Sequence, residues 1–110
     1  MSVEQTIKAA WEGRISGCLL GKPVEMISMR EGREGLNKYL SESGSLPLRN
    51  YVRPMDHEMI RGANKRCCLG LMDKAEADDD ITYSVLGLMM LEQHGTKLNT
   101  DDVARSWINL

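Results

Sequence analysis

The sequence of 110 residues contains no phenylalanine, only two tryptophans and three tyrosines, and no long apolar run. An apolar run of about 18 residues would be needed for a membrane span. The first residues also lack the apolar stretch of a secretory signal peptide. The formal net charge of -2 gives no electrostatic reason to expect a nucleic acid or an anionic membrane as a partner. We therefore expect a cytoplasmic protein that binds neither membranes nor nucleic acid.

Cysteine is also scarce. Cys18, Cys67 and Cys68 are odd in number, and two direct neighbours do not easily bridge each other. This pattern is typical of reduced thiols in the cytoplasm. Because no Cys-His-Asn arrangement marks Cys67 or Cys68 as a nucleophile, we expect both in an apolar core. Neither His57 nor His94 has zinc-like spacing to a cysteine pair, and we expect His94 at the surface of a helix end.

Apolar residues at spacings of three and four predict a helix over residues 4–20. Gly13, Gly17 and Gly21 interrupt it at intervals of four, and each glycine costs a helix interior about 1 kcal/mol relative to alanine. Close approach of another backbone would explain three glycines on one side, so we expect tight helix packing there. The helix should end before Pro23, because the residue before a proline is disfavoured in helical geometry.

The middle of the chain has weaker periodicity. A short helix is predicted over Glu31–Leu40, followed by a Ser/Gly turn. The prolines that follow argue against a further regular element. We therefore expect a long irregular connection at about 41–66, of a length that is usually functional or mobile.

Residues 80–94 give the clearest helical pattern. Its apolar face is predicted to include Val85, Leu88 and Met89, with Ile81 one turn earlier and Leu86 and Met90 flanking. Gly95 suits a left-handed C-terminal cap. No segment shows convincing strand alternation. The sequence thus predicts an all-α fold.

A last helix is predicted from Asn99, a good N-cap residue, with the acidic pair at 101–102 in its first turn against the helix dipole. Its apolar face carries Val103, Trp107 and Leu110. Exposing such side chains forfeits about 1.5 to 3 kcal/mol each. We therefore expect association, most simply a two-fold dimer, with Trp107 or the face at 85–91 in the interface.

Three consecutive aspartates, Asp78, Asp79 and Asp80, stand directly before the helix at 80–94. One aspartate suffices to cap a helix, for about 1 kcal/mol. The alternative is a site for a hard cation, because Mg²⁺ and Ca²⁺ prefer carboxylate oxygens. The spacing alone leaves both interpretations open.

Three stretches together resemble the ADP-ribosylglycohydrolase family. They are GRISGCLLGKPVE at 13–25, ADDDITYSVLGLMMLEQHG at 77–95 and the closing GTKLNTDDVARSWINL. The resemblance implies an all-helical fold and hydrolysis of the N- or O-glycosidic bond that joins ADP-ribose to an acceptor. The expected partner is accordingly an ADP-ribosylated substrate or an ADP-ribose-like small molecule.

The same resemblance implies roles for individual residues. Asp78, Asp79 and Asp80 match the family's cluster that supplies ligands to a pair of Mg²⁺ ions. Glu25 matches a glutamate at the substrate cleft, which makes Glu25 and Asp79 the implied catalytic residues. Gly21 and Glu25 are the implied substrate-binding residues, and Glu25 should face the aspartates across the cleft.

The sequence departs from the family pattern at several points. Cys18 stands where many relatives have aspartate, Lys22 adds a positive charge beside the turn, and Asp78 replaces a threonine. The C-terminal Asp-x-Asp motif that completes the metal site in relatives is not found. We therefore expect residues 1–110 to form one incomplete helical domain, the N-terminal part of a larger fold. Its Mg²⁺ binding should be weak or absent, and it should not turn over alone. The alternative is a small helical module that self-associates without catalysis.

Overall fold

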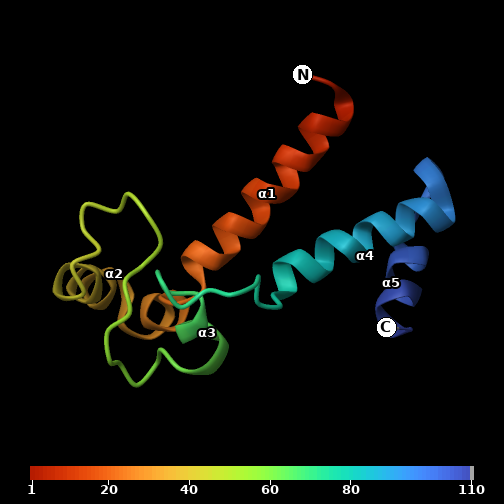
Figure 1. The fold of residues 1–110 in the computed structure, drawn as a ribbon. Coiled ribbons are helices and arrows are strands. Elements are labelled where there is room, and N and C mark those ends of the chain that lie inside the picture. Colours follow the sequence, from red (N-terminus) through yellow and green to blue (C-terminus); the bar gives the residue numbers. More distant parts are fainter. Residues whose placement is uncertain (110) are drawn as a thin grey trace. The chain divides into compact units, whose positions relative to one another are not determined.

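A computed structural model describes residues 1–109, and these residues are mostly helical and contain no strand (Figure 1). The elements are α1 (Val3–Gly21), α2 (Glu25–Glu42), α3 (Gly62–Arg66), α4 (Asp79–His94), the 3-10 turn η1 (Gly95–Lys97) and α5 (Thr100–Ile108). The predicted all-α class is confirmed. No helix within residues 1–109 is long and apolar enough to cross a membrane. The chain divides into two compact units, one of residues 1–76 and one that begins at Ala77.

Helix α1 begins at a capping box that the sequence analysis did not identify. The Gln5 backbone N–H donates to Ser2 Oγ at 3.2 Å, and the Ser2 N–H donates to Gln5 Oε1 at 2.8 Å. These two bonds satisfy backbone donors that the first turn of a helix leaves without partners. The helix ends at Gly21, as predicted, and Pro23 directly beyond it is fully buried.

The three glycines of α1 have no close neighbour within the first unit. No atom lies within 4 Å of the position that a Cβ would take at Gly13, Gly17 or Gly21. The expected close approach of another backbone is therefore not found in residues 1–76. The glycines lower the intrinsic stability of α1 without a packing gain in this unit.

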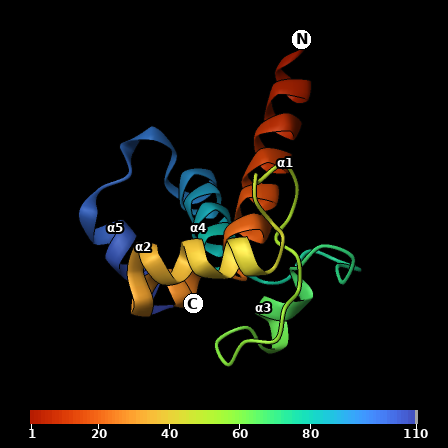
Figure 2. The same ribbon diagram turned by 90° about the vertical axis from the view of Figure 1, so that its left-hand side faces the viewer.

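Helix α2 begins at Glu25, six residues before the predicted start, and is kinked at Gly32 (φ 65°, ψ −157°). This backbone region is essentially restricted to glycine. The half after the kink matches the predicted helix, whereas the half before it was missed because Gly32 and Gly35 obscure the apolar period. The ribbon of α2 changes direction at this point (Figure 2).

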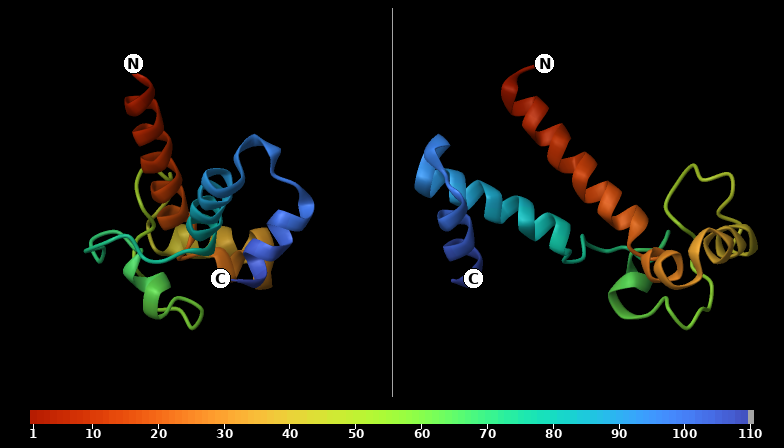
Figure 3. Two further views of the ribbon diagram at one scale, coloured as in Figure 1. Left: turned by 90° about the vertical axis from the view of Figure 1, so that its right-hand side faces the viewer. Right: turned by 180° about the vertical axis from the view of Figure 1, so that it is seen from behind.

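The segment between α2 and α3 is irregular, as predicted, but the expected limits of 41–66 are too wide. Helix α2 continues to Glu42, and the last five residues of the predicted connection form α3 (Figure 3). Tyr39 fixes the connection, because its hydroxyl donates to Arg53 O and accepts from the Met55 N–H, both at 3.1 Å. The Arg53 N–H in turn donates to Ser45 Oγ at 3.0 Å.

The core of the first unit combines helices with this connection. Its buried members are Ile27, Tyr39, Leu40, Val52, Ile60 and Cys68. The predicted burial of the two neighbouring cysteines is confirmed, since Cys67 and Cys68 are both 0% exposed. Burial is the main cause that raises the pKa of the Cys68 thiol, and the nearby Cys67 adds to it. A thiol in that state is a poor nucleophile.

In the second unit, α4 and α5 pack against each other. The Asn99 cap is confirmed, and it forms a capping box with Asp102. The rings of Tyr83 in α4 and Trp107 in α5 stack with centroids 4.9 Å apart. Trp107 nevertheless remains 49% exposed, as expected. Leu110, which was expected to share its face, lies outside the described residues.

The centre of the apolar face predicted for α4 is wrong, since the buried side chains are the two that were expected to flank it. Leu86 and Met90 are its buried side chains, whereas Val85, Leu88 and Met89 are each more than two-fifths exposed. The error arises because α4 carries apolar residues around its whole circumference, so the sequence does not show which side faces α5. A helix that is apolar all round normally requires cover on more than one side.

The end of α4 corrects the predicted cap in one respect. Gly95 has the positive φ expected of it, 63°, but its ψ of −155° lies outside the left-handed helical region. It therefore adopts the same glycine-restricted conformation as Gly32. The chain continues directly into η1.

Candidate functional site

The three aspartates occupy different positions at the start of α4. Asp78 is the N-cap, with Oδ1 accepting from the Asp80 N–H at 3.1 Å. Its carbonyl oxygen also accepts from Thr82 Oγ1 at 3.0 Å. Asp79 and Asp80 occupy the exposed first turn, and their carboxylates make no hydrogen bond or ion pair with residues 1–109. The capping interpretation thus accounts for Asp78 and leaves two carboxylates unexplained.

The start of α5 offers a comparison within the same unit. Asn99 Oδ1 accepts from the N–H groups of Asp101 and Asp102 at 2.9 and 3.1 Å. The Asp102 carboxylate accepts from the Asn99 N–H at 3.2 Å and lies 3.8 Å from His94 Nδ1. His94 was expected at the surface, but its side chain is only 26% exposed, because it lies beside Asp102. Here local structure explains the carboxylate of Asp102, which distinguishes this helix start from that of α4.

Gly21 and Glu25 flank the tight turn between α1 and α2. The Val24 N–H donates to the Gly21 carbonyl oxygen at 3.1 Å, which closes the turn. Glu25 is the first residue of α2 and is exposed. Both residues belong to the first unit, whereas the aspartates belong to the second. A shared cleft for Glu25 and the aspartates stays a prediction.

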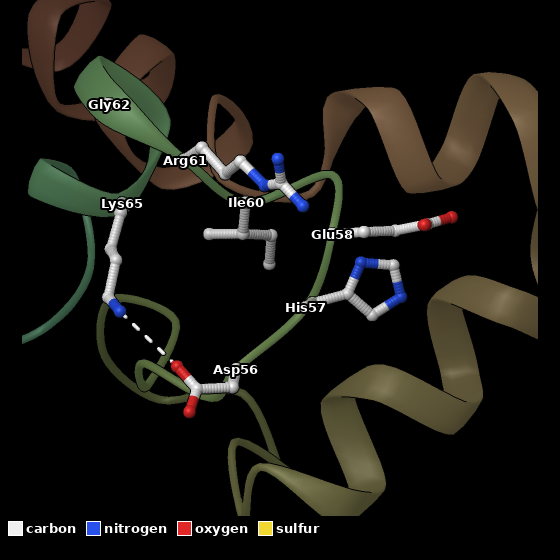
Figure 4. Close-up of a pocket in the computed structure, with 7 residues that line it drawn as sticks. All are labelled: Asp56, His57, Glu58, Ile60, Arg61, Gly62 and Lys65. Atoms are coloured by element: carbon white, nitrogen blue, oxygen red, sulfur yellow. Dashed lines mark hydrogen bonds and ion pairs between the residues drawn. The ribbon is translucent and has the colours of Figure 1, made fainter.

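A hollow of about 560 Å³ lies in the first unit, where the sequence indicated no site. It is lined by Asp56, His57, Glu58, Ile60, Arg61, Gly62 and Lys65 (Figure 4). In the sequence, His57 was assessed only as a zinc ligand, for which its spacing to the cysteines is unsuitable. The signal in the sequence was a cluster of four charged residues and a histidine within ten positions.

The last residue of the first unit is held by an ion pair. Arg66 Nε and Nη2 donate to the two carboxylate oxygens of Glu76, the second at 3.1 Å. Glu76 is only 9% exposed. The hydrogen bond from Arg66 is the main cause that lowers the pKa of Glu76, and the same bond raises the pKa of Arg66. This pair fastens the end of the unit to α3 and is structural in its effect.

No family model, no curated protein and no solved structure matches the chain. A functional assignment therefore rests on the chemistry of the described residues together with the motif resemblance. The strongest chemical feature in the second unit is the pair of exposed carboxylates of Asp79 and Asp80, whose only local role among residues 1–109 is their favourable position at the N-terminal end of the helix dipole.

Proposed function

We propose that this chain is the N-terminal part of an ADP-ribosylglycohydrolase that depends on Mg²⁺. The supporting observation is that the exposed carboxylates of Asp79 and Asp80, in the first turn of α4, have no hydrogen-bond or ion-pair partner among residues 1–109. Capping requires only Asp78, and the resemblance of 77–95 to the family's acidic helix start gives the remaining two a use. The proposed reaction hydrolyses the bond between ADP-ribose and a nitrogen or oxygen acceptor.

The residues fit the chemistry that this reaction requires. Carboxylate oxygens suit Mg²⁺, which prefers hard oxygen ligands, and bound Mg²⁺ would supply positive charge to hold the ribose hydroxyls. Asp79 and Glu25 are the proposed catalytic carboxylates: Asp79 accepts a proton from the attacking water, Glu25 stabilises the oxocarbenium-like transition state, and the acceptor atom takes up a proton as its bond to ADP-ribose breaks. Asp78, Asp79 and Asp80 contribute metal ligands, and Gly21 leaves room for substrate beside Glu25.

Metal binding at α4 can be tested by nuclear magnetic resonance with Mn²⁺ as a paramagnetic probe for Mg²⁺. We expect selective broadening of amide signals at 79–83 and dissociation constants for Mn²⁺ and Mg²⁺ in the millimolar range or weaker, because only part of a ligand set is present. Asp79→Asn should reduce the broadening. Asp101→Asn, in the equivalent turn of α5, is the matched control. Equal broadening at both helix starts would contradict the proposal, and micromolar Mg²⁺ binding measured by calorimetry would contradict the incomplete ligand set.

Activity can be tested directly through the release of ADP-ribose from ADP-ribosylated peptides. The 110 residues alone should show no turnover. The natural protein that carries them should show turnover that EDTA abolishes and Asp79→Asn reduces by at least about 100-fold, the order expected for a general base. Activity that is insensitive to EDTA would overturn the assignment.

The second unit also supports another function, self-association without catalysis. Leu88, Met89 and Trp107 are each about half exposed, although burial of such side chains is worth about 1.5 to 3 kcal/mol each. Light scattering at micromolar concentration should then report a mass above 12.4 kDa. Leu88→Glu should restore the monomer, whereas Val3→Glu, at an exposed apolar position of α1, should not. A monomer in the unmodified protein would refute this alternative.

A further inference from the structure

The hollow in the first unit surrounds a residue of the core. Ile60 is 2% exposed, and its N–H donates to the His57 carbonyl oxygen at 3.1 Å, which closes a turn. Figure 4 shows Arg61, Lys65 and Asp56 arranged around the Ile60 side chain. The volume of about 560 Å³ falls within the range of small-molecule sites, roughly 300 to 1,000 Å³.

The walls of this hollow are held in place by contacts with the core. His57 Nδ1 accepts from the Met59 N–H at 3.2 Å, and the imidazole lies edge-on to Tyr39 at 5.6 Å between ring centroids. Tyr39 is itself buried, and its hydroxyl is fully engaged by the connection. On the opposite side, Lys65 Nζ lies 3.3 Å from Asp56 Oδ1 in an ion pair at the surface. The His57 side of the hollow is therefore formed before any ligand arrives.

The hollow is lined by two acidic and two basic side chains, but they are not all paired with one another. Lys65 and Asp56 neutralise each other, and the Glu58 carboxylate points away from Ile60 (Figure 4). The Arg61 guanidinium has no hydrogen-bond or ion-pair partner among residues 1–109, and Arg61 lines the hollow together with Ile60 (Figure 4). The Arg61 guanidinium, with its planar set of N–H donors, is thus the unpaired positive group at the hollow within these residues. Arginine presents these donors in the geometry that suits carboxylate and phosphate oxygens.

We propose that this hollow binds a small molecule through an anionic group, a carboxylate or a phosphate, with Arg61 as the principal contact. Lys65 becomes the second contact when the ligand draws it from Asp56. The proposal rests on these side chains and not on the start of α3, which is too short to act as an anion site by itself. Binding is on the order of millimolar, because exposed ion pairs gain little free energy in water. The site is independent of the aspartates of α4.

The test is a titration followed by amide chemical shifts, with inorganic phosphate and acetate as separate probes at constant ionic strength. Saturable shifts are expected at residues 57–65, and the probe with the lower dissociation constant identifies the preferred group. Arg61→Gln should raise that constant at least about fivefold, and Arg61→Lys should raise it less, because it keeps the charge but loses the fork. Arg53→Gln, at an exposed arginine outside the hollow, should leave it unchanged.

Asp56→Asn should change the dissociation constant in the opposite direction. It removes the carboxylate that competes for Lys65, so it should lower the dissociation constant about two- to fivefold. Thermal unfolding by circular dichroism checks that each variant remains folded. Shifts that do not saturate, an equal loss in Arg53→Gln, or no tightening in Asp56→Asn would each overturn the proposal and indicate only a general attraction of ions to the surface.

Discussion

In residues 1–76, the largest fully buried side chains come from helices and an irregular connection together, with Ile27 and Tyr39 from α2 and Val52 from the connection. Among residues 77–109 of the second unit, only Leu86 and Met90 are buried. The second unit has the more regular structure and the smaller core. Two helices in contact cover one side of each other, whereas a connection that folds back adds a further layer. Regular secondary structure is therefore a poor guide to which part of this chain is better packed.

The largest expected effect on stability comes from removing a buried apolar side chain of the first unit, in contrast to an exposed one of the second. Ile27→Ala should lower the free energy of unfolding by about 2 to 5 kcal/mol, because it removes a side chain that is 0% exposed from the core. Leu91→Ala, at a position 52% exposed on α4, should change it by less than about 0.5 kcal/mol. Urea denaturation measures both. Equal losses would mean that the second unit has more cover than its own helices provide.

A smaller effect is expected from the hydroxyl that holds the connection in the core. Tyr39→Phe leaves the Met55 N–H and the Arg53 carbonyl without their partner, which should cost about 1 to 3 kcal/mol. Amide hydrogen exchange at Met55 should accelerate as well. Tyr51→Phe, at a half-buried tyrosine in the same connection, is the control and should stay within about 0.5 kcal/mol of the unmodified protein.

The smallest effect concerns the ion pair that closes the first unit. Hydrogen bonding to Arg66 lowers the folded-state pKa of Glu76 below its usual value of 4.5. The ionised carboxylate thus stabilises the folded state above about pH 4.5, and this stabilisation is lost as the pH falls through the lowered folded-state pKa.

Glu76→Gln should therefore have a lower Tm than the unmodified protein at pH 7. The difference in Tm should narrow as the pH falls from about 5 toward 3. Scanning calorimetry over that range measures it. The exposed Glu92, as Glu92→Gln, should show no such convergence. A gap that stays constant with pH would assign the effect to packing of Glu76.

Local signals in the sequence predicted several features of the fold correctly. The end of α1 before Pro23, the cap at Asn99 and the burial of the two neighbouring cysteines were all predicted, and a cap at one of the three aspartates was one of two interpretations. Each depends on chemistry within a few residues, such as a side chain that accepts from the next turn or a proline ring that excludes helical geometry. The aspartates' proposed metal and Glu25's proposed role rest on resemblance and stay predictions.

Features that depend on distant contacts were not predictable in the same way. Which side of α4 is buried depends on where α5 lies, and an all-apolar helix carries no periodic signal of it. The hollow around Ile60 is lined by residues 56–65, so its charged cluster is visible in the sequence, but the burial of Ile60 depends on a core shared with α2. The first half of α2 was missed because Gly32 breaks the helical period while the chain resumes a helix beyond it.

Gly32 and Gly95 carry a consequence for the mutational tolerance of this chain. Both are exposed, and neither has an atom within 4 Å of where a Cβ would stand. A count of neighbours would rank them among the most replaceable positions. Yet their φ values of 65° and 63°, with ψ near −155°, lie where any side chain costs roughly 1 to 3 kcal/mol. In a library of all single substitutions these two open sites should be depleted as strongly as buried ones, which shows that an exposed position can still be intolerant to change when backbone torsion alone constrains it.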